Sequence, residues 1–216
     1  MSFVVSPGEI VSVVGVNGAG KTTLMRVLST LVTPEAGSII LDGFNIASHP
    51  ERFRRQLGYL PEKPAMYEDM TVKNYLIYRA ELKGEPSKRI RRRVGEAAEM
   101  CRVTEMLRTP IRNLSAGQKK RVALADALLL RPRVLLLDDF LAGLDRSMRS
   151  SIGTVLSEAA AFSSVIVTGH EIADFAKWAT RFLVLKNGVI ANSIQVAGAE
   201  ASVLAAKVTS VLEECR

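Results

Sequence analysis

Residues 10–22 read IVSVVGVNGAGKT, and this stretch decides the fold. The run from Ile10 to Val14 is rich in β-branched residues and predicts a short strand. Gly15 to Thr22 then matches the pattern G-x-x-x-x-G-K-S/T. Glycines let the backbone curl so that several N–H groups point at one phosphate, at the positive end of the helix that follows. A strand, a phosphate loop and a helix in this order predict an α/β domain.

The candidate nucleotide-binding residues lie in this loop and in the first turn of its helix. Lys21 adds a positive charge for the β- and γ-phosphates, and Thr22 offers a hydroxyl to Mg²⁺. We therefore expect a nucleoside triphosphate and Mg²⁺ as ligands. The predicted nucleotide-binding residues are Asn17, Gly18, Ala19, Gly20, Lys21, Thr22 and Thr23.

A second stretch, LLLDD at 135–139, supplies candidate carboxylates. The continuous apolar run from Val134 to Leu137 predicts a strand buried in a parallel sheet. Open parallel sheets place ligand groups at the C-terminal ends of their strands, so Asp138 is suited to hold Mg²⁺ through water. Apolar strands often end in Asp, but next to a phosphate loop this pattern indicates a nucleotide site.

Between Thr71 and about Thr109 the apolar residues recur at helical spacing. We expect a mostly helical subdomain here, inserted into an α/β core that resumes after it. The prediction is one domain over 1–216, with the core at 1–70 and 110–216 and the helical subdomain at about 71–109. The predicted fold class is α/β, a P-loop NTPase core with a parallel-rich sheet and an inserted helical subdomain. The other predicted elements are strands at 38–41, 164–168 and 181–185, helices at 20–31, 118–130, 147–161, 172–178 and 199–214, and a hairpin turn at 186–188.

Composition and charge exclude several classes of protein. A hydrophobic content of 48% is ordinary for a globular domain, and no apolar run approaches the ~20 residues that a membrane helix needs. The N-terminus carries no secretory signal pattern, and Cys101 and Cys215 lack metal-ligand spacing, which fits a reduced cytosol. Much of the net charge of +7 lies at 88–93, where no aromatic residues interleave. We interpret this stretch as a solvated helix face, with anionic lipid or a partner loop as the alternative, and expect no nucleic acid partner.

With these motifs the chain resembles the nucleotide-binding subunit of ATP-binding cassette (ABC) transporters, from about residue 3 to residue 196. LSAGQ at 114–118 looks like the signature loop of that family, and LAGLD at 141–145 looks like the loop after its Walker B strand. His170 lies where the family has its switch histidine, and GYLPE at 58–62 falls where it has the Q-loop. The residues from Pro61 to Val72 are similar to export-type cassettes with separate membrane subunits.

The resemblance implies a mechanism and partners. Two cassettes, identical or different, pair head to tail and sandwich ATP with Mg²⁺, and each signature loop contacts the partner's ATP. The implied site residues are Asp139 and His170 for catalysis, Ser115, Ala116, Gly117 and Gln118 for the partner's ATP, Asp145 in the D-loop, and Thr22, Glu62 and Asp138 for Mg²⁺. Closure on ATP would drive a polytopic membrane subunit, docked between the helical subdomain and the Glu62 loop. The subunit would lie peripherally on the cytoplasmic face of the inner or plasma membrane.

Three positions depart from the family pattern. The family usually has Glu after the Walker B aspartate to polarise the attacking water, whereas this chain has Asp139 followed by Phe140. The shorter side chain loses roughly 1.5 Å of reach, so we expect either slow hydrolysis or a nearly silent site. Glu62 replaces the Q-loop glutamine, and a carboxylate serves Mg²⁺ at least as well. Only 14 residues precede Gly15, and Phe3 lies too close to the loop to stack on adenine, so either the start is trimmed or misassigned or adenine binds without that aromatic.

Two other interpretations stay open. One is a soluble ABC ATPase in translation or DNA maintenance, although such proteins usually carry two cassettes or long coiled coils. The other is a regulatory cassette that binds ATP without significant turnover, which Asp139 favours. The sequence does not predict a transported substrate, because the membrane subunit would select it.

Overall fold

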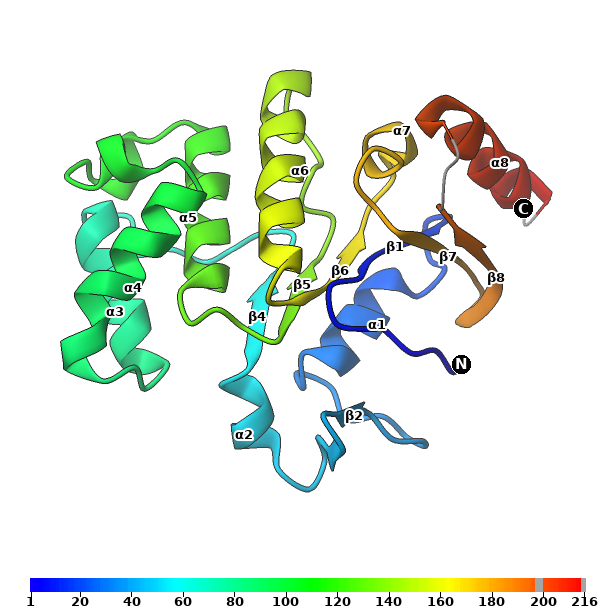
Figure 1. Ribbon diagram of the computed structural model, residues 1–216, viewed down its shortest axis with the longest axis horizontal. Helices are drawn as coiled ribbons and strands as arrows, with labels where there is room; N and C mark the ends of the chain where they lie inside the picture. Colours follow the sequence, from blue (N-terminus) through cyan, green and yellow to red (C-terminus); the bar gives the residue numbers. More distant parts are fainter. Residues whose placement is uncertain (197–199, 215–216) are drawn as a thin grey trace.

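The computed structural model of the chain describes residues 1–196 and 200–214. A six-stranded sheet crosses the molecule in the strand order β4-β5-β6-β1-β7-β8 (Figure 1). Neighbouring strands from β4 to β7 in this order pair in parallel, and β8 pairs antiparallel with β7. The predicted α/β class with a parallel-rich sheet is confirmed. The strands are β1 (Ile10–Gly15), β4 (Leu57–Leu60), β5 (Val134–Leu137), β6 (Ser164–Thr168), β7 (Arg181–Lys186) and β8 (Val189–Gln195).

The central strands are buried because helices cover both faces of the sheet. On one face α1 (Lys21–Leu28) places Met25 in a hydrophobic cluster with Val11 and Val13 of β1. Ile10 and Val14 alternate with those valines and belong to the larger cluster on the other face. Figure 1 shows the helices of that second face on the opposite side from α1. They are α6 (Arg146–Ala160), α7 (Ile172–Phe175) and α8 (Ala201–Glu214).

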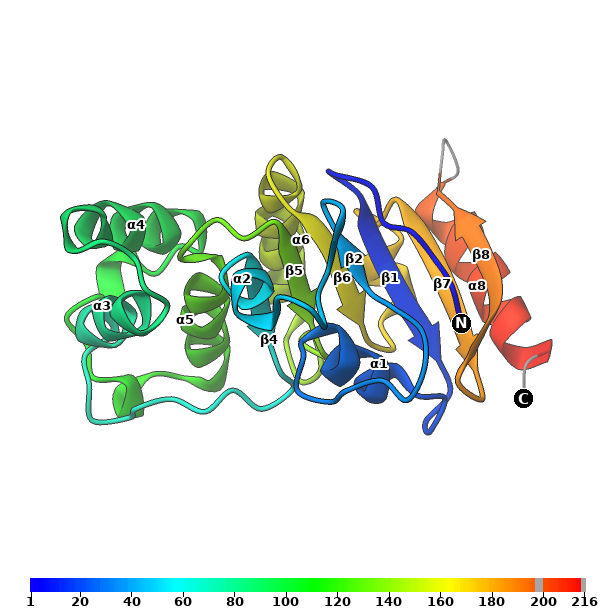
Figure 2. The ribbon, with the colours of Figure 1, turned by 90° about the horizontal axis from the view of Figure 1, so that it is seen from below.

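Three helices form a lobe at the β4 end of the sheet (Figure 2). They are α3 (Val72–Leu82), α4 (Ser87–Met100) and α5 (Ala116–Leu128). All residues from Val122 to Leu128 of α5 are buried, and all of them except Asp126 share one hydrophobic cluster with α3, α4 and the sheet. The segment predicted to be helical at 71–109 thus contains α3 and α4, and α5 packs between it and the sheet. Shorter elements are β2 (Ile40–Leu41), β3 (Phe44–Asn45), α2 (Pro50–Arg54) and the 3-10 turns η1 (Thr104–Met106) and η2 (Ile111–Asn113).

A buried ion cluster joins α3 to α5. Asp126, which is 8% exposed, accepts hydrogen bonds from Arg79 at 2.9 Å, from Lys83 at 2.7 Å and from the hydroxyl of Tyr75 at 3.3 Å. Burial alone would raise the pKa of Asp126, but the cations of Lys83 and Arg79 outweigh it and lower that pKa. Asp126 is thus a buried and paired carboxylate.

Several predicted boundaries differ from the observed ones. The helix predicted at 118–130 begins at Ala116, because Ser115 caps it. The helix predicted at 172–178 is only the short α7, the strand predicted at 38–41 is only β2, and the helix predicted at 20–31 ends at Leu28. The hairpin turn at 186–188 is confirmed, since Asn187 and Gly188 have φ of 47° and 77°, as a two-residue hairpin loop of this type requires. The predicted start of the last helix, at 199, lies outside the described residues.

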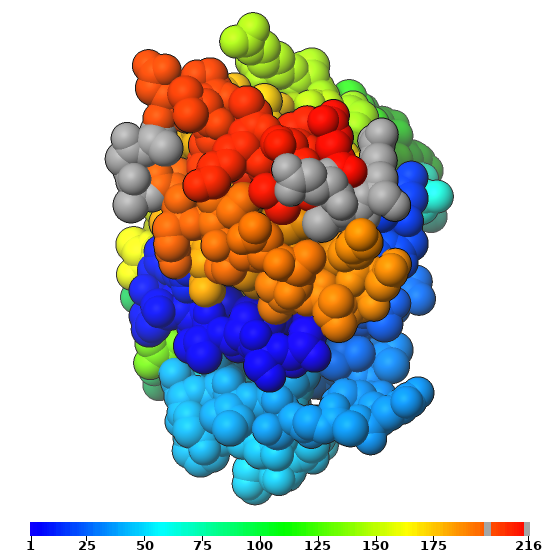
Figure 3. Space-filling view, turned by 90° about the vertical axis from the view of Figure 1, so that its right-hand side faces the viewer, coloured from blue at the N-terminus to red at the C-terminus, as the bar shows by residue number. Residues whose placement is uncertain are grey.

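The β7–β8 hairpin and α8 form the surface at the other end of the sheet. Figure 3 shows both beside the N-terminal residues on this face. Phe3 and Val5 are partly buried there against the cluster that includes α1. Within residues 1–196 and 200–214, no helix combines the length and the apolar character needed to cross a membrane.

Candidate functional site

Four parallel strands deliver the candidate site residues to one edge of the sheet. β1 ends at Gly15, where the phosphate loop begins, and β5 ends just before Asp138. The registers Leu60 with Leu137 and Leu137 with Val167 place the ends of β4, β5 and β6 level with one another. The loops after these strands therefore meet at the carboxyl edge, where open α/β sheets bind ligands.

The phosphate loop has the backbone shape that its glycines permit. Gly20, the N-cap residue just before α1, has a φ of 103°, a conformation that L side chains rarely adopt. A Cβ on Gly15 would lie 2.5 Å from the carbonyl oxygen of Leu185, so only glycine fits next to β7. The amide of Gly188, in the β7–β8 turn, donates to the carbonyl of Ala19 at 2.9 Å. The β7–β8 hairpin thus holds the phosphate loop through this hydrogen bond.

Lys21 folds back into this loop. Its ammonium group donates to the carbonyl of Gly15 at 2.7 Å and to that of Val16 at 3.1 Å. Burial lowers the pKa of Lys21, and the carboxylates of Asp139 and Asp138 partly oppose that shift. Asn17, Gly18, Thr22 and Thr23 are exposed around it, while Ala19 is buried. The cationic group thus lies at the centre of a polar, open loop.

Asp138 joins the phosphate loop to β6. This carboxylate is 2% exposed, and its Oδ1 accepts hydrogen bonds from Thr168 Oγ1 at 2.7 Å and from Thr22 Oγ1 at 3.4 Å. The described residues hold no group of three or more His, Cys, Asp or Glu side chains that could bind a metal ion alone. Mg²⁺, however, usually takes only one or two protein oxygens when phosphates and water supply the others. The oxygens of Thr22 and Asp138 therefore fit a Mg²⁺–nucleotide complex.

Asp139 occupies a strained position next to this pair. Its φ is 45°, which is uncommon for a residue other than glycine. Its amide donates to Thr168 Oγ1 at 3.0 Å, whereas its buried Oδ1 has no hydrogen-bond partner. Burial raises the pKa of Asp139, Glu171 raises it further, and His170 opposes the change. An unpartnered carboxylate with a raised pKa at a ligand edge is the kind of group that accepts a proton in catalysis.

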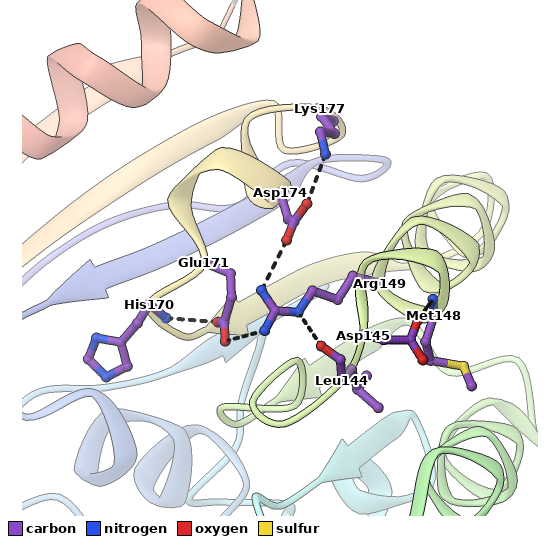
Figure 4. A network of polar contacts seen from close by, with 8 residues as sticks. All are labelled: Leu144, Asp145, Met148, Arg149, His170, Glu171, Asp174 and Lys177. Carbon is purple, nitrogen blue, oxygen red and sulfur yellow. Dashed lines mark hydrogen bonds and ion pairs between the residues drawn. The ribbon is translucent and has the colours of Figure 1, made fainter.

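Arg149 of α6 connects the predicted D-loop with the segment that carries His170 (Figure 4). Its Nε donates to the carbonyl of Leu144 at 2.8 Å, and its other nitrogens pair with Asp174 at 3.2 Å and with Glu171 at 3.7 Å. Glu171 in turn accepts a hydrogen bond from the amide of His170 at 3.1 Å. In Figure 4 the imidazole of His170 points away from these contacts. The exposed ring of His170 is therefore held on a segment with a fixed backbone.

The signature segment forms the capped start of α5. Ser115 Oγ accepts from the amide of Gln118 at 3.2 Å, and Gln118 Oε1 accepts from the amide of Ser115 at 2.8 Å, which is a capping box. Gly117 packs so closely on α6 that a Cβ would lie 2.9 Å from Met148. Ser115 and Ala116 are exposed, and the first-turn amides of α5, including that of Gly117, have no partner within the helix. This end of α5 can therefore donate to an anion outside the chain.

The predicted site residues thus fall into two groups. Asp138, Asp139 and the phosphate loop lie together, and Glu62 follows β4 close enough for its charge to raise the pKa of Asp139. No hydrogen bond or ion pair among the described residues joins the signature loop to the phosphate loop. Asp145 lies outside both groups as the N-cap of α6, where its side chain accepts from the amide of Met148 at 2.8 Å.

Sequence reasoning missed several residues that organise the first group. Thr168 bonds both aspartates, and its position as the last residue of a strand, two residues before His170, could have indicated it. No sequence motif indicates Arg149 or Glu171. Lys120 donates to the carbonyl of Phe140 at 2.8 Å, from a stretch that the sequence predicts only as helix.

Comparisons with known proteins agree with the sequence resemblance. Residues 1–142 match the family model described as ABC transporter. The chain is 33% identical over 190 residues to the uncharacterized ABC transporter ATP-binding protein YxlF of Bacillus subtilis, covering 88% of this chain and 63% of YxlF. It is 31% identical over 191 residues to the ABC-type transporter ATP-binding protein EcsA of the same organism, covering 88% of this chain and 77% of EcsA. Other relatives are named as import ATP-binding proteins.

A solved structure has the same fold over nearly the whole chain. It is cbiO1 from Clostridium perfringens, described as part of the ABC transporter complex cbiONQ. The TM-score is 0.84 at 27% identity, and the match covers 97% of this chain and 84% of the other. The present chain thus corresponds to most of a solved cassette, and it spans about three fifths of the length of YxlF.

Proposed function

The chain belongs to the ABC transporter family, and from this premise we propose that it binds and hydrolyses Mg²⁺–ATP to drive a separate membrane subunit. The observation that carries the proposal is the contact of Asp138 with Thr22. It places a buried carboxylate from one strand beside a hydroxyl from the phosphate loop, although 116 positions separate them in sequence. These are the two oxygens that a Mg²⁺–nucleotide complex needs from the protein.

Each residue of the site has a proposed task. Lys21 would exchange its two backbone carbonyl partners for phosphate oxygens, which offer a stronger charge-assisted contact. The amides of residues 17–22 would hold the phosphates at the start of α1. Mg²⁺, when bound, neutralises charge that develops on the phosphate oxygens. Asp139 would accept the proton of the attacking water, and His170 would donate to the γ-phosphate.

The partner's ATP is the proposed ligand of the signature loop. Ser115 already accepts from the amide of Gln118, but its hydroxyl hydrogen stays available to donate. The unpartnered amides of the first turn of α5 add a positive end to the same surface. A second cassette in head-to-tail contact would bring its nucleotide there. Homodimer and heterodimer are both compatible with this arrangement, and the export-type subclass stays a prediction.

A second candidate function rests on Asp139. The family usually has Glu at this position, and the turn that carries Asp139 is tied to Thr168, so a backbone shift does not easily restore the missing reach. The alternative is therefore a cassette that binds ATP and closes without significant turnover.

The decisive experiment measures nucleotide binding and phosphate release for wild type and Lys21→Ala. We expect Lys21→Ala to lose ATP affinity by at least about tenfold, because it removes the charge at the phosphates. Lys73→Ala is the matched control, since Lys73 is an exposed lysine on α3, outside the loop. Equal ATP affinity for wild type and Lys21→Ala would overturn the proposal. Binding without phosphate release would support the second candidate instead.

The partner proposals need two further measurements. Asp139→Asn with ATP should accumulate as a dimer in size-exclusion chromatography, because closure would not be followed by hydrolysis. Co-purification from membranes should recover a polytopic subunit. A protein that stays monomeric with ATP in every variant would contradict a homodimer.

A further inference from the structure

Lys120 bridges two parts of the site that lie far apart in the sequence. It lies in the second turn of α5, two residues after the signature segment, and its side chain is half-buried. Its ammonium group donates to the carbonyl of Phe140 at 2.8 Å and also to the carbonyl of Ala142. The same group lies 5.6 Å from the centre of the Phe140 ring. One side chain from α5 thus holds the turn that follows Asp139.

The turn after β5 is otherwise held at only a few points. The amide of Asp139 donates to Thr168 at 3.0 Å, and the amide of Ala142 reaches the carbonyl of Asp139 at a long 3.4 Å. The side chains of Phe140 and Leu141 are each 1% exposed and anchor the turn in the core. The carbonyls of Phe140 and Ala142 belong to no strand or helix ladder, so the contacts from Lys120 supply their hydrogen bonds.

The charges around Lys120 link it to catalysis as well as to the turn. The carboxylates of Asp139, Glu171 and Glu62 act on it, as does the cation of Arg149. Burial lowers the pKa of Lys120, and the three carboxylates oppose this shift, while Arg149 adds to it. The ammonium group is therefore a positive charge beside the carboxylate cluster that raises the pKa of Asp139.

We propose that Lys120 is a positioning residue for the hydrolysis: it holds the turn that aims Asp139 and fixes this turn to the helix that carries the signature loop. The inference rests on the proposed function. It adds a physical connection between the carboxylate that serves the chain's own nucleotide and the loop that serves the partner's. A displacement of α5 would pull directly on the backbone next to Asp139.

The first test uses the nucleotide-free protein and needs no turnover. Hydrogen–deuterium exchange of a peptide covering 138–144 would be compared in wild type, Lys120→Met and Lys120→Arg. We expect Lys120→Met to speed exchange in this peptide on the order of tenfold, because two charge-assisted hydrogen bonds are lost, with no change at 15–22. Lys120→Arg keeps a donor for both carbonyls and should restore protection. Lys119→Met is the matched control, since Lys119 pairs with the exposed Glu68.

The second test measures the turnover of ATP. Lys120→Met should lower kcat by about tenfold and leave KM within about twofold, since the nucleotide contacts are untouched. Lys120→Arg should restore kcat toward the wild-type value, because it keeps a donor for both carbonyls.

The outcomes distinguish this inference from the function that it rests on. Unchanged exchange at 138–144 in Lys120→Met, or equal exchange in Lys120→Met and Lys120→Arg, would overturn the role of Lys120. A wild type that releases no phosphate but shows the expected exchange pattern would count against hydrolysis and leave the structural link in place. A fall in kcat that Lys120→Arg does not restore would also overturn the role of Lys120.

Discussion

Asp139→Glu should raise the rate of ATP hydrolysis. The substitution adds one methylene, about 1.5 Å of reach, to the candidate base. In the present structure the turn that carries Asp139 cannot move by that amount at low cost. The amide of Asp139 donates to Thr168, the amide of Asp138 donates to Leu60 at 2.9 Å, and Lys120 holds two carbonyls beyond it. The reach deficit therefore persists in the folded protein.

The expected magnitude follows from this restraint. A misplacement of about 1 Å costs on the order of a hundredfold in rate, or about 2.7 kcal/mol of activation free energy. A water molecule between Asp139 and the attacking water would recover part of this loss. We therefore expect kcat of Asp139→Glu to exceed that of wild type by about ten- to a hundredfold, with KM little changed.

Steady-state phosphate release measures the effect, with Asp139→Asn and Asp139→Gln as matched controls. Asn has the size of Asp and Gln has the size of Glu, but neither amide can act as the base. Both variants should therefore show only the residual rate. Wild type should lie between Asp139→Asn and Asp139→Glu. If wild type and Asp139→Glu turn over equally fast, the reasoning about reach is refuted. If wild type equals Asp139→Asn, the chain is a cassette that binds ATP with little turnover.

Three further predictions concern protonation and stability. Burial, and then Glu171, raise the pKa of Asp139. As the pH is lowered, kcat should therefore begin to fall at a pH above ~3.9, the pKa of a free aspartate. A pH–rate profile without such an acid limb would disagree. Asp126→Asn should destabilise the fold by about 3 kcal/mol in urea unfolding, since it leaves two cations without their buried partner, whereas Asp69→Asn, in an exposed ion pair, should cost less than about 1 kcal/mol. The carboxylate contribution of Asp126 is present above its unfolded pKa and should be lost as the pH falls below about 4, because its folded pKa is lowered. Gly153→Ala should destabilise the fold by about 1 kcal/mol, because its Cβ would lie 2.5 Å from the indole ring of Trp178. Gly95→Ala, in open space within a helix, should stabilise the fold by up to about 1 kcal/mol. Thermal unfolding that ranks the two variants the other way would contradict this packing.

Much of the fold could be predicted from local patterns. The phosphate loop requires glycines at fixed spacing, so β1, the loop and α1 followed directly from residues 10–22. The apolar run before Asp138 predicted a buried parallel strand, and it is one. The Asn187–Gly188 turn was predictable because few other residues adopt its backbone conformation.

The parts that escaped prediction depend on long-range contacts. Thr168 is an ordinary strand residue by sequence, and its role arises only because β6 lies beside β5. The pairing of Asp126 depends on the packing of α3 against α5, which no local pattern encodes. The early start of α5 had a local signal, since Ser115 and Gln118 have capping-box spacing, but the predicted helix begins only at Gln118 and Ser115 is predicted only as a contact of the partner's nucleotide.

The single hydroxyl of Thr168 has a consequence for how this site can be altered. It donates to the proposed Mg²⁺ carboxylate and accepts from the amide of the proposed base. Metal affinity and the position of the base therefore both depend on the Thr168 hydroxyl and cannot vary independently. A substitution at Thr168 that moves the backbone of Asp139 would also alter the Mg²⁺ concentration at which the site works. Engineering one property of this cassette would require compensation in the other.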